Sequence, residues 1–256
     1  MSMRRVRVIP VLLIRNKGLV KSIKFKNHKY VGDPINAVKV FNEKEVDEIC
    51  LLDITASNSN RDPDYDHISE IVSEAFMPLS YGGGINSIIH AERLFYSGIE
   101  KITINKSFYS NPALVETIAS KYGRQSICVS IDFGKNWLGK NYAYISNGKI
   151  RTKYTPLEIA LKAQDYGAGE IFLNSISRDG TYSGYEIDVI ANITSKLKIP
   201  LVACGGAGSV DDFIKAIEAG ASAVAAGSMF VFQRPNQAVL ISYPSLEQFE
   251  KINLNL

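Results

Sequence analysis

Two glycine-rich segments half a chain apart constrain the fold of this sequence more than any other feature. The first is Tyr81-Gly82-Gly83-Gly84-Ile85, and the second is Cys204-Gly205-Gly206-Ala207-Gly208. Each follows a short apolar run and precedes a segment with helical spacing. Glycine lets backbone N–H groups converge on an anion, and a helix N-terminus behind them adds a positive dipole. One copy is explained equally well by a tight turn, but two copies in matching contexts favour a pair of phosphate sites.

The repeat extends beyond the glycines. Polar or apolar residues at the ends of other apolar runs recur in the same order about half a chain later: Leu13 is matched by Asp132, Asp53 by Asn174, and Asn105 by Gly227. A period of this length is far too long for a solenoid. It is explained by two fused halves of a single barrel.

Apolar runs alternate with amphipathic segments along the whole chain. The expected strands are residues 6–13, 49–54, 77–80, 101–104, 126–131, 170–173, 200–203 and 223–226, and the expected helices are 34–45, 67–75, 87–97, 112–122, 156–166, 187–196, 210–218 and 245–251. This alternation indicates parallel βα units, and eight such units close a barrel. An open, doubly wound sheet is the alternative, but it does not account for the repeat. We therefore expect an α/β fold, a (βα)8 TIM barrel of two similar halves, as one domain over residues 1–256.

Two segments interrupt the alternation. Asn147-Gly148 lies between the runs 142–145 and 149–154, which predicts a hairpin with a type I′ turn. We expect this insertion, about residues 141–154, to form a small lid or wall on the catalytic face. The segment 15–29 is expected to be a loop; its basic residues are Arg15, Lys17, Lys21, Lys24, Lys26 and Lys29. At the mouth of a barrel such a loop would attract a phosphorylated substrate, although simple solvation is the alternative.

Composition and motifs exclude several function classes. The net charge is only +3 at pH 7, so no nucleic-acid partner is indicated. The three cysteines, Cys50, Cys128 and Cys204, are widely spaced without a metal-ligand pattern, which is typical of reduced thiols in a cytoplasmic protein. We find no signal peptide or spanning run and expect no membrane partner. Neither a catalytic triad nor a GxGxxG fingerprint occurs, so no metal or other cofactor is expected.

Asp132 is the strongest candidate for proton transfer. It follows Val129-Ser130-Ile131, so its carboxyl group would emerge from an apolar barrel floor, where desolvation raises the pKa. The alternative is that it accepts hydrogen bonds from the amides of its own loop. The repeat predicts a partner carboxylate at the matched position of the first half. That position is Leu13, which cannot transfer a proton.

Four segments in this order resemble the cyclase subunit of imidazole glycerol phosphate synthase, the HisF-like family. They are 51–57 (Leu-Leu-Asp-Ile-Thr-Ala-Ser), 82–85 (Gly-Gly-Gly-Ile), 175–181 (Ser-Ile-Ser-Arg-Asp-Gly-Thr) and 204–208 (Cys-Gly-Gly-Ala-Gly). The resemblance runs from about Arg5 to Phe232. It implies a duplicated (βα)8 barrel that receives ammonia from a HisH-like glutaminase docked at its N-terminal face. It also implies a substrate with two phosphates, each held by one glycine site.

The resemblance also implies roles for individual residues. Asp132 matches a catalytic aspartate. The phosphate- and ligand-binding positions are Gly83, Gly84, Asn105, Lys106, Asn174, Asp179, Gly180, Gly205, Gly206, Gly227 and Ser228. The four charges of the ammonia gate are Arg7, Glu48, Lys101 and Glu170. A buried ring of charges is costly unless it is used or paired. Its retention therefore favours a working channel and a glutaminase partner over an ordinary salt-bridged barrel floor.

The chain departs from the family at three matched positions. Leu13 stands where the family has a catalytic aspartate, and Lys106 and Asn174 replace threonines. Loss of one of two proton carriers typically slows a reaction on the order of a hundredfold to ten-thousandfold. Ordinary cyclase activity is therefore not expected unless another group replaces the missing acid.

Two functional interpretations follow from the resemblance. One branch of the family also lacks the strand-one aspartate; it belongs to surface-polysaccharide gene clusters and supplies ammonia to a separate sugar amidotransferase that makes acetamidino sugars. Leu13 favours this conduit. The alternative is a genuine cyclase of histidine biosynthesis. The sister isomerase of that pathway shares the duplicated barrel, but it needs the aspartate pair and has no use for a charged gate.

Overall fold

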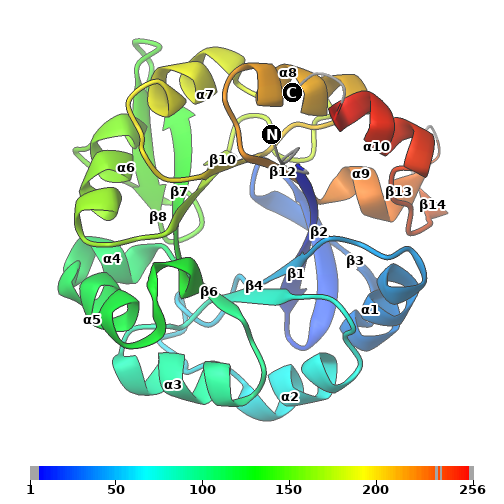
Figure 1. The fold of residues 1–256 in the computed structure, drawn as a ribbon, viewed down its shortest axis with the longest axis horizontal. Helices are drawn as coiled ribbons and strands as arrows, with labels where there is room; N and C mark the ends of the chain where they lie inside the picture. Colours follow the sequence, from blue (N-terminus) through cyan, green and yellow to red (C-terminus); the bar gives the residue numbers. More distant parts are fainter. Residues whose placement is uncertain (1–5, 234–235, 237, 254–256) are drawn as a thin grey trace.

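Eight parallel strands form a closed ring in the computed structural model, which describes residues 6–233, 236 and 238–253 (Figure 1). The barrel strands are β1 (Arg7–Arg15), β4 (Ile49–Asp53), β5 (Leu79–Gly82), β6 (Lys101–Ile104), β7 (Ile127–Lys135), β10 (Glu170–Ser175), β11 (Leu201–Cys204) and β12 (Ala223–Ala226). β1 pairs with both β12 and β4, which closes the ring. The predicted (βα)8 TIM barrel is confirmed. The remaining residues of the expected domain, including Arg5 at the edge of the resemblance, lie outside the described residues.

A helix follows each barrel strand and covers the outside of the ring (Figure 1). These helices are α1 (Pro34–Glu43), α2 (Tyr65–Ser73), α3 (Ile88–Tyr96), α5 (Ala113–Tyr122), α6 (Pro156–Asp165), α7 (Ile187–Thr194), α8 (Val210–Glu218) and α10 (Leu246–Asn253). Their starts follow local sequence signals: Asp33 accepts a hydrogen bond from the Asn36 amide, and Thr155 forms a capping box with Glu158. All eight match expected helices, with ends shifted by a few residues.

Several short elements were not predicted. Two short helices, α4 (Lys106–Ser110) and α9 (Ser228–Val231), directly follow β6 and β12, so they occupy equivalent places in the two halves. The 3-10 turn η1 (Arg124–Ser126) precedes β7, and the strands β13 (Phe232–Gln233) and β14 (Ala238–Val239) form a small separate ribbon. Helical segments of this length are too short for an apolar period to be recognised in the sequence.

Side chains of the barrel strands alternate between two cores. Outward-facing residues such as Val8, Leu12 and Leu51 pack against the helices. Inward-facing residues form a separate interior cluster: Ile9, Val11, Cys50, Cys128, Phe172, Val202, Cys204, Ala223 and Ala225, with Leu13 and Leu52 packed against it. All three cysteines lie in this cluster with free thiols, and burial raises the pKa of Cys50 to about 12. This interior cluster is therefore apolar and uncharged.

The basic segment that was expected to be a loop is instead a β-hairpin. β2 (Gly18–Ile23) pairs antiparallel with the end of β1, and β3 (Lys26–Gly32) pairs with β2. The loop prediction was wrong because the many lysines masked the apolar residues Leu19 and Val20, which are buried as in an ordinary strand. The turn between β1 and β2 uses positive φ at Asn16 and Lys17.

A second hairpin lies between β7 and α6. β7 continues beyond Asp132 and pairs antiparallel with β8 (Asn141–Ile145), which pairs with the short β9 (Ile150–Arg151). Both Asn147 and Gly148 have positive φ, as a type I′ turn requires. The Asn147 Nδ2 atom donates to the Ile54 carbonyl oxygen at 2.6 Å, so this turn reaches across to the C-terminal end of β4.

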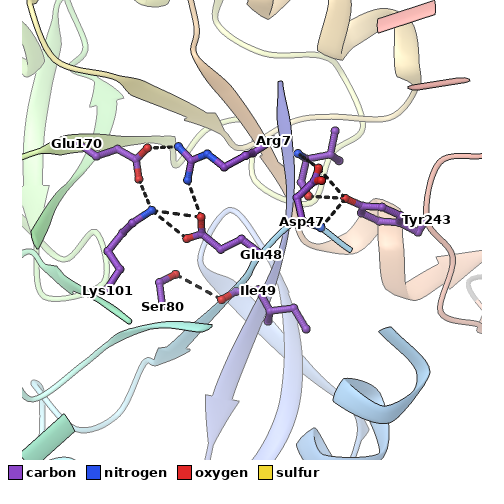
Figure 2. A network of polar contacts seen from close by, with 9 residues as sticks. Arg7, Asp47, Glu48, Ile49, Ser80, Lys101, Glu170 and Tyr243 are labelled. Carbon is purple, nitrogen blue, oxygen red and sulfur yellow. Dashed lines mark hydrogen bonds and ion pairs between the residues drawn. The ribbon is translucent and has the colours of Figure 1, made fainter. Parts of the chain in front are cut away.

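Tyr243 ties the chain after β12 to the start of the barrel. Its hydroxyl donates to the Val8 carbonyl oxygen at 2.7 Å and accepts from the Asp47 amide at 3.3 Å (Figure 2). We expect Tyr243→Phe to lower the free energy of unfolding by about 1–2 kcal/mol, because two buried backbone groups lose their partner. Urea unfolding measures this. Tyr96→Phe, at a residue 96% exposed, is the control and should leave stability unchanged; equal stability of both variants would contradict the role of Tyr243.

Candidate functional site

A cavity of about 130 Å³ opens at the C-terminal ends of the barrel strands. Most residues that the sequence assigned to a ligand line it: Gly83, Gly84, Asn105, Lys106, Asp132, Asn174, Asp179, Gly227 and Ser228. They come from both halves of the barrel. Gly180, Gly205 and Gly206, which were assigned to the same site, are not among the described residues that line the cavity. The structure thus brings together one polar site at the end of the barrel where catalytic residues of this fold lie.

Asp132 lies in β7, beside Asn174 of the neighbouring strand β10, and lines the cavity. Among the described residues no backbone amide donates a hydrogen bond to its carboxyl group. Its side-chain contacts are with Asn105, whose Nδ2 lies 3.4 Å from Oδ2, and with Asn174. Burial, and next the negative charge of Asp179, raise the pKa of Asp132 to about 7, against the hydrogen bond from Asn174. A carboxyl group with this pKa both donates and accepts protons near neutrality.

Asp53, the other aspartate at a strand end, is used differently. One of its oxygens accepts hydrogen bonds from the Thr55 hydroxyl at 2.6 Å and from the Thr55 and Ala56 amides at 2.8 and 3.0 Å. Its other oxygen pairs with Arg61 at 3.0 Å. Asp53 therefore organises its own loop, which is the structural role that was considered for Asp132. The structure therefore gives different contacts to Asp53 and Asp132, although each follows an apolar run in the sequence.

The glycine segments fit closely onto the strand ends beside them. A Cβ atom on Gly83 would lie 2.4 Å from the Asp53 carbonyl oxygen, and one on Gly205 would lie 2.6 Å from the Ser175 carbonyl oxygen. Both glycines also have positive φ, which L side chains rarely adopt. The tight-turn explanation therefore accounts for both residues. Among the described glycines of the two segments, Gly82, Gly83 and Gly84 also line the cavity, whereas the second segment lines it through Cys204.

Lys21 lines the cavity, and it was not singled out as a site residue in the sequence. It projects from β2, is only 4% exposed, and its Nζ atom donates to the Val11 carbonyl oxygen. Burial lowers the pKa of Lys21 to about 8, although the charge of Asp179 opposes this shift. The signal in the sequence was the apolar pair Leu19 and Val20 directly before it, which marks a buried strand.

Asp179 and Gly180 hold the first hairpin over the cavity. The Asp179 Oδ2 atom accepts a hydrogen bond from the Ser22 hydroxyl at 2.8 Å, and its carbonyl oxygen accepts from the Lys24 amide at 2.9 Å. A Cβ atom on Gly180 would lie 2.3 Å from the Ser22 carbonyl oxygen, so only glycine permits this contact. The hairpin in turn adds Phe25 and His28 to the cavity lining.

The four predicted gate residues form a closed ring of ion pairs at the opposite end of the barrel (Figure 2). Arg7 pairs with Glu170 and, at 2.5 Å, with Glu48; Lys101 lies 2.8 Å from Glu170 and 3.2 Å from Glu48. Both glutamates are 6% exposed. Burial lowers the pKa of Arg7 and of Lys101, but the two glutamates outweigh it and hold both pKa values above the ordinary range. Cations and anions alternate, so the ring is neutral.

Other site types find no support in the described part of the chain. Among these residues no group of three or more histidine, cysteine, aspartate or glutamate side chains could hold a metal ion. None of the helices within residues 6–233 and 238–253 is both long and apolar enough to cross a membrane. The polar chemistry of these residues is concentrated at the two ends of the barrel.

The buried Asp132 carboxyl predicts a pH dependence of stability. Its pKa is higher in the folded chain than the usual 3.8, so the wild type loses stability as pH rises from about 4 to about 7. We expect Asp132→Asn to be more stable than wild type at pH 8, on the order of 1–3 kcal/mol, and to lose this advantage at pH 4–5. Urea unfolding at both pH values tests it, with the exposed Asp165→Asn as control. A pH-independent difference would contradict the burial of a titrating carboxyl at position 132.

Comparison with known proteins agrees with this architecture. Residues 7–235 match the family described as “Histidine biosynthesis protein”. Two relatives provisionally named as imidazole glycerol phosphate synthase subunits are hisF2 of Pseudomonas aeruginosa, 50% identical over 97% of this chain and 99% of its own, and hisF3 of Vibrio vulnificus, 46% identical over 97% and 96%. The imidazole glycerol phosphate synthase subunit HisF of Streptomyces coelicolor is 38% identical over 89% and 90%. The chain belongs to the histidine biosynthesis protein family, as a member of its HisF group of imidazole glycerol phosphate synthase subunits.

Proposed function

We propose that this barrel conducts ammonia from a glutaminase at its N-terminal face to the cavity at its C-terminal face, where a phosphorylated ligand binds. The observation that carries the proposal is the ring of Arg7, Glu48, Lys101 and Glu170, which closes one end of an apolar interior whose other end is the cavity. Two buried glutamates with two half-buried cations at this position are costly to retain for stability alone. These charged residues have a function if they form a gate that opens to ammonia when a partner docks.

The interior cluster supports the path between the two ends. Val11, Leu13, Leu52 and Cys204 belong both to this cluster and to the cavity lining, so the cluster reaches the cavity. Burial keeps the pKa of the Cys50, Cys128 and Cys204 thiols above the ordinary range, so they stay neutral. Ammonia is itself small and neutral, and a passage without charged groups leaves it unprotonated.

Exposed aromatic side chains near the ring support a docked partner. Phe76 precedes β5 and is 89% exposed, and Tyr96 ends α3, ahead of β6, and is 96% exposed. Both therefore lie towards the N-terminal ends of the strands, as the ring does. Large aromatic residues left in solvent are typical of surfaces that another protein covers.

Leu13 favours the ammonia conduit over the cyclase as the function of this chain. It lines the cavity on β1, where it can neither donate nor accept a proton. We infer that the barrel passes ammonia on to a separate sugar amidotransferase, in the acetamidino-sugar pathway of a surface polysaccharide, rather than catalysing the cyclase reaction itself. The alternative, a cyclase of histidine biosynthesis, is favoured by one observation: the raised pKa of Asp132, about 7, suits an acid–base catalyst.

A turnover assay distinguishes these two functions. We expect the wild-type barrel, given an ammonium salt and the bis-phosphorylated formimino intermediate of histidine biosynthesis, to show no turnover. Leu13→Asp restores the second proton carrier and should raise the rate by on the order of a hundredfold or more above that background. Asp132→Asn combined with Leu13→Asp is the matched control and should be inactive. Turnover by the wild type would instead establish the cyclase.

The docking surface is tested separately with a HisH-like glutaminase. We expect a stable complex in size-exclusion chromatography, and we expect Phe76→Glu with Tyr96→Glu to weaken binding by at least about thirtyfold, since burying two new charges at an interface costs several kcal/mol. Trp137→Glu is the control, because Trp137 is 88% exposed but follows β7 at the opposite end of the barrel. Equal loss of binding in the control, or none in the double variant, would contradict docking at the N-terminal face.

A further inference from the structure

Lys21 is a buried lysine without an acidic partner. Among the described residues no carboxylate lies within ion-pair distance of its Nζ atom, whose one hydrogen-bond acceptor is the Val11 carbonyl oxygen. Nζ also borders the cavity beside Gly227, where an added Cβ atom would lie 2.9 Å away. A buried ammonium group in such surroundings is poorly stabilised. Burial therefore raises the fraction of Lys21 that is present as the neutral amine.

The groups around Lys21 compensate its charge only in part. Asp179 acts on Lys21 through its negative charge, but its carboxylate accepts hydrogen bonds from the Ser22 hydroxyl and the Phe25 amide rather than forming an ion pair with Lys21. The thiols of Cys50 and Cys204, which also act on Lys21, are held neutral by burial. The charge of Asp179 therefore offsets the effect of burial on the Lys21 pKa only in part.

Leu13 contributes directly to this environment. It lies two residues from Val11 on the same inward face of β1, and both residues line the cavity with Lys21. An aspartate at position 13 would place a carboxylate near the amine and favour the ammonium form. The leucine removes that charge.

We propose that Lys21 is a nucleophile that forms an imine with the carbonyl group of a phosphorylated open-chain sugar bound in the cavity. The neutral Nζ amine attacks the carbonyl carbon, and the carbonyl oxygen takes up a proton to give a carbinolamine. The attacking nitrogen loses one proton in this step. The carbinolamine hydroxyl is then protonated and leaves as water, while the C=N bond forms and nitrogen loses its second proton, so that one water is released overall. Asp132 lines the same cavity and serves as the proton donor and acceptor for these steps.

Charge and space in the cavity indicate the ligand class. The ends of β5 and β6 contribute Lys106 and Ser107 together with Gly83 and Gly84 to the cavity, which suit a phosphate group, whereas the Lys21 Nζ atom lies beside Gly227 after β12. A phosphate held there leaves the rest of a short sugar chain directed across the cavity towards Lys21. The inference rests on the proposed function for the phosphorylated ligand alone, and it requires neither the glutaminase nor ammonia.

Reductive trapping tests this proposal on the barrel alone. The protein is incubated with D-ribose 5-phosphate and sodium cyanoborohydride at pH 7.5, and modified lysines are located by peptide mass spectrometry. A lysine with a pKa of about 8 has roughly a hundredfold more neutral amine at this pH than an exposed one. We expect Lys21 to be labelled at least about tenfold faster than the exposed lysines, and D-ribose without phosphate to label it more slowly.

Two variants serve as controls with opposite expectations. Lys21→Arg keeps a cation but removes the amine, so the fast-reacting site should disappear, whereas Lys26→Arg on the exposed strand β3 should leave it intact. Leu13→Asp retains Lys21, and its labelling at pH 7.5 should fall by about tenfold because the new carboxylate favours the ammonium form. Labelling of Lys21 no faster than that of the exposed lysines would overturn the proposal. Unchanged labelling in Leu13→Asp would equally overturn it. Calorimetric titration with ribose 5-phosphate shows whether the phosphorylated ligand binds, which distinguishes failure of the proposed ligand site from failure of imine formation at Lys21.

Discussion

The pairing of β1 with both β12 and β4 is the interaction on which the rest of this structure depends. Once the ring of parallel strands is closed, every strand begins at one end of the barrel and finishes at the other. Charged residues at strand starts must then meet around one opening, and polar residues at strand ends around the other. The alternation of side chains leaves an apolar interior between them. The separation of a charged ring from a polar cavity follows from this one topology.

The two halves of the barrel have kept their backbone geometry and diverged in chemistry. Gly83 packs on the carbonyl of Asp53 and Gly205 on that of Ser175, and α4 and α9 follow equivalent strands. At the matched strand ends, however, Asp53 organises a loop, whereas Asn174 has a buried Oδ1 atom without a hydrogen-bond partner among the described residues. The two halves therefore present side chains at equivalent positions, but the residues at those positions and their contacts differ.

The sequence predicted the barrel because it depends on a regular feature, the alternation of strands with helices, whereas the ring was predicted only from the resemblance to the HisF-like family. It also predicted most of the cavity lining, since strand ends are easy to recognise. It could not predict the hairpin that carries Lys21, because basic residues in a strand resemble a solvated loop until the fold buries them. Nor could the sequence distinguish the role of Asp53 from that of Asp132, because each follows an apolar run. Only the hydrogen bonds of Asp53 to its own loop distinguish the two residues.

The treatment of buried charge distinguishes the two ends of the barrel. At the ring, Arg7 and Lys101 pair with the two glutamates, so the charged forms of Arg7 and Lys101 are favoured. In the cavity, Asp132 and Lys21 have no ion-pair partner among the described residues, and desolvation shifts both towards their neutral forms, with pKa values of about 7 and 8. A fold under selection for stability alone would pair or replace such groups. Titratable groups with shifted pKa values and no ion-pair partner, lying together at a cavity, are typical of functional sites, whereas the charges of the ring are paired with one another.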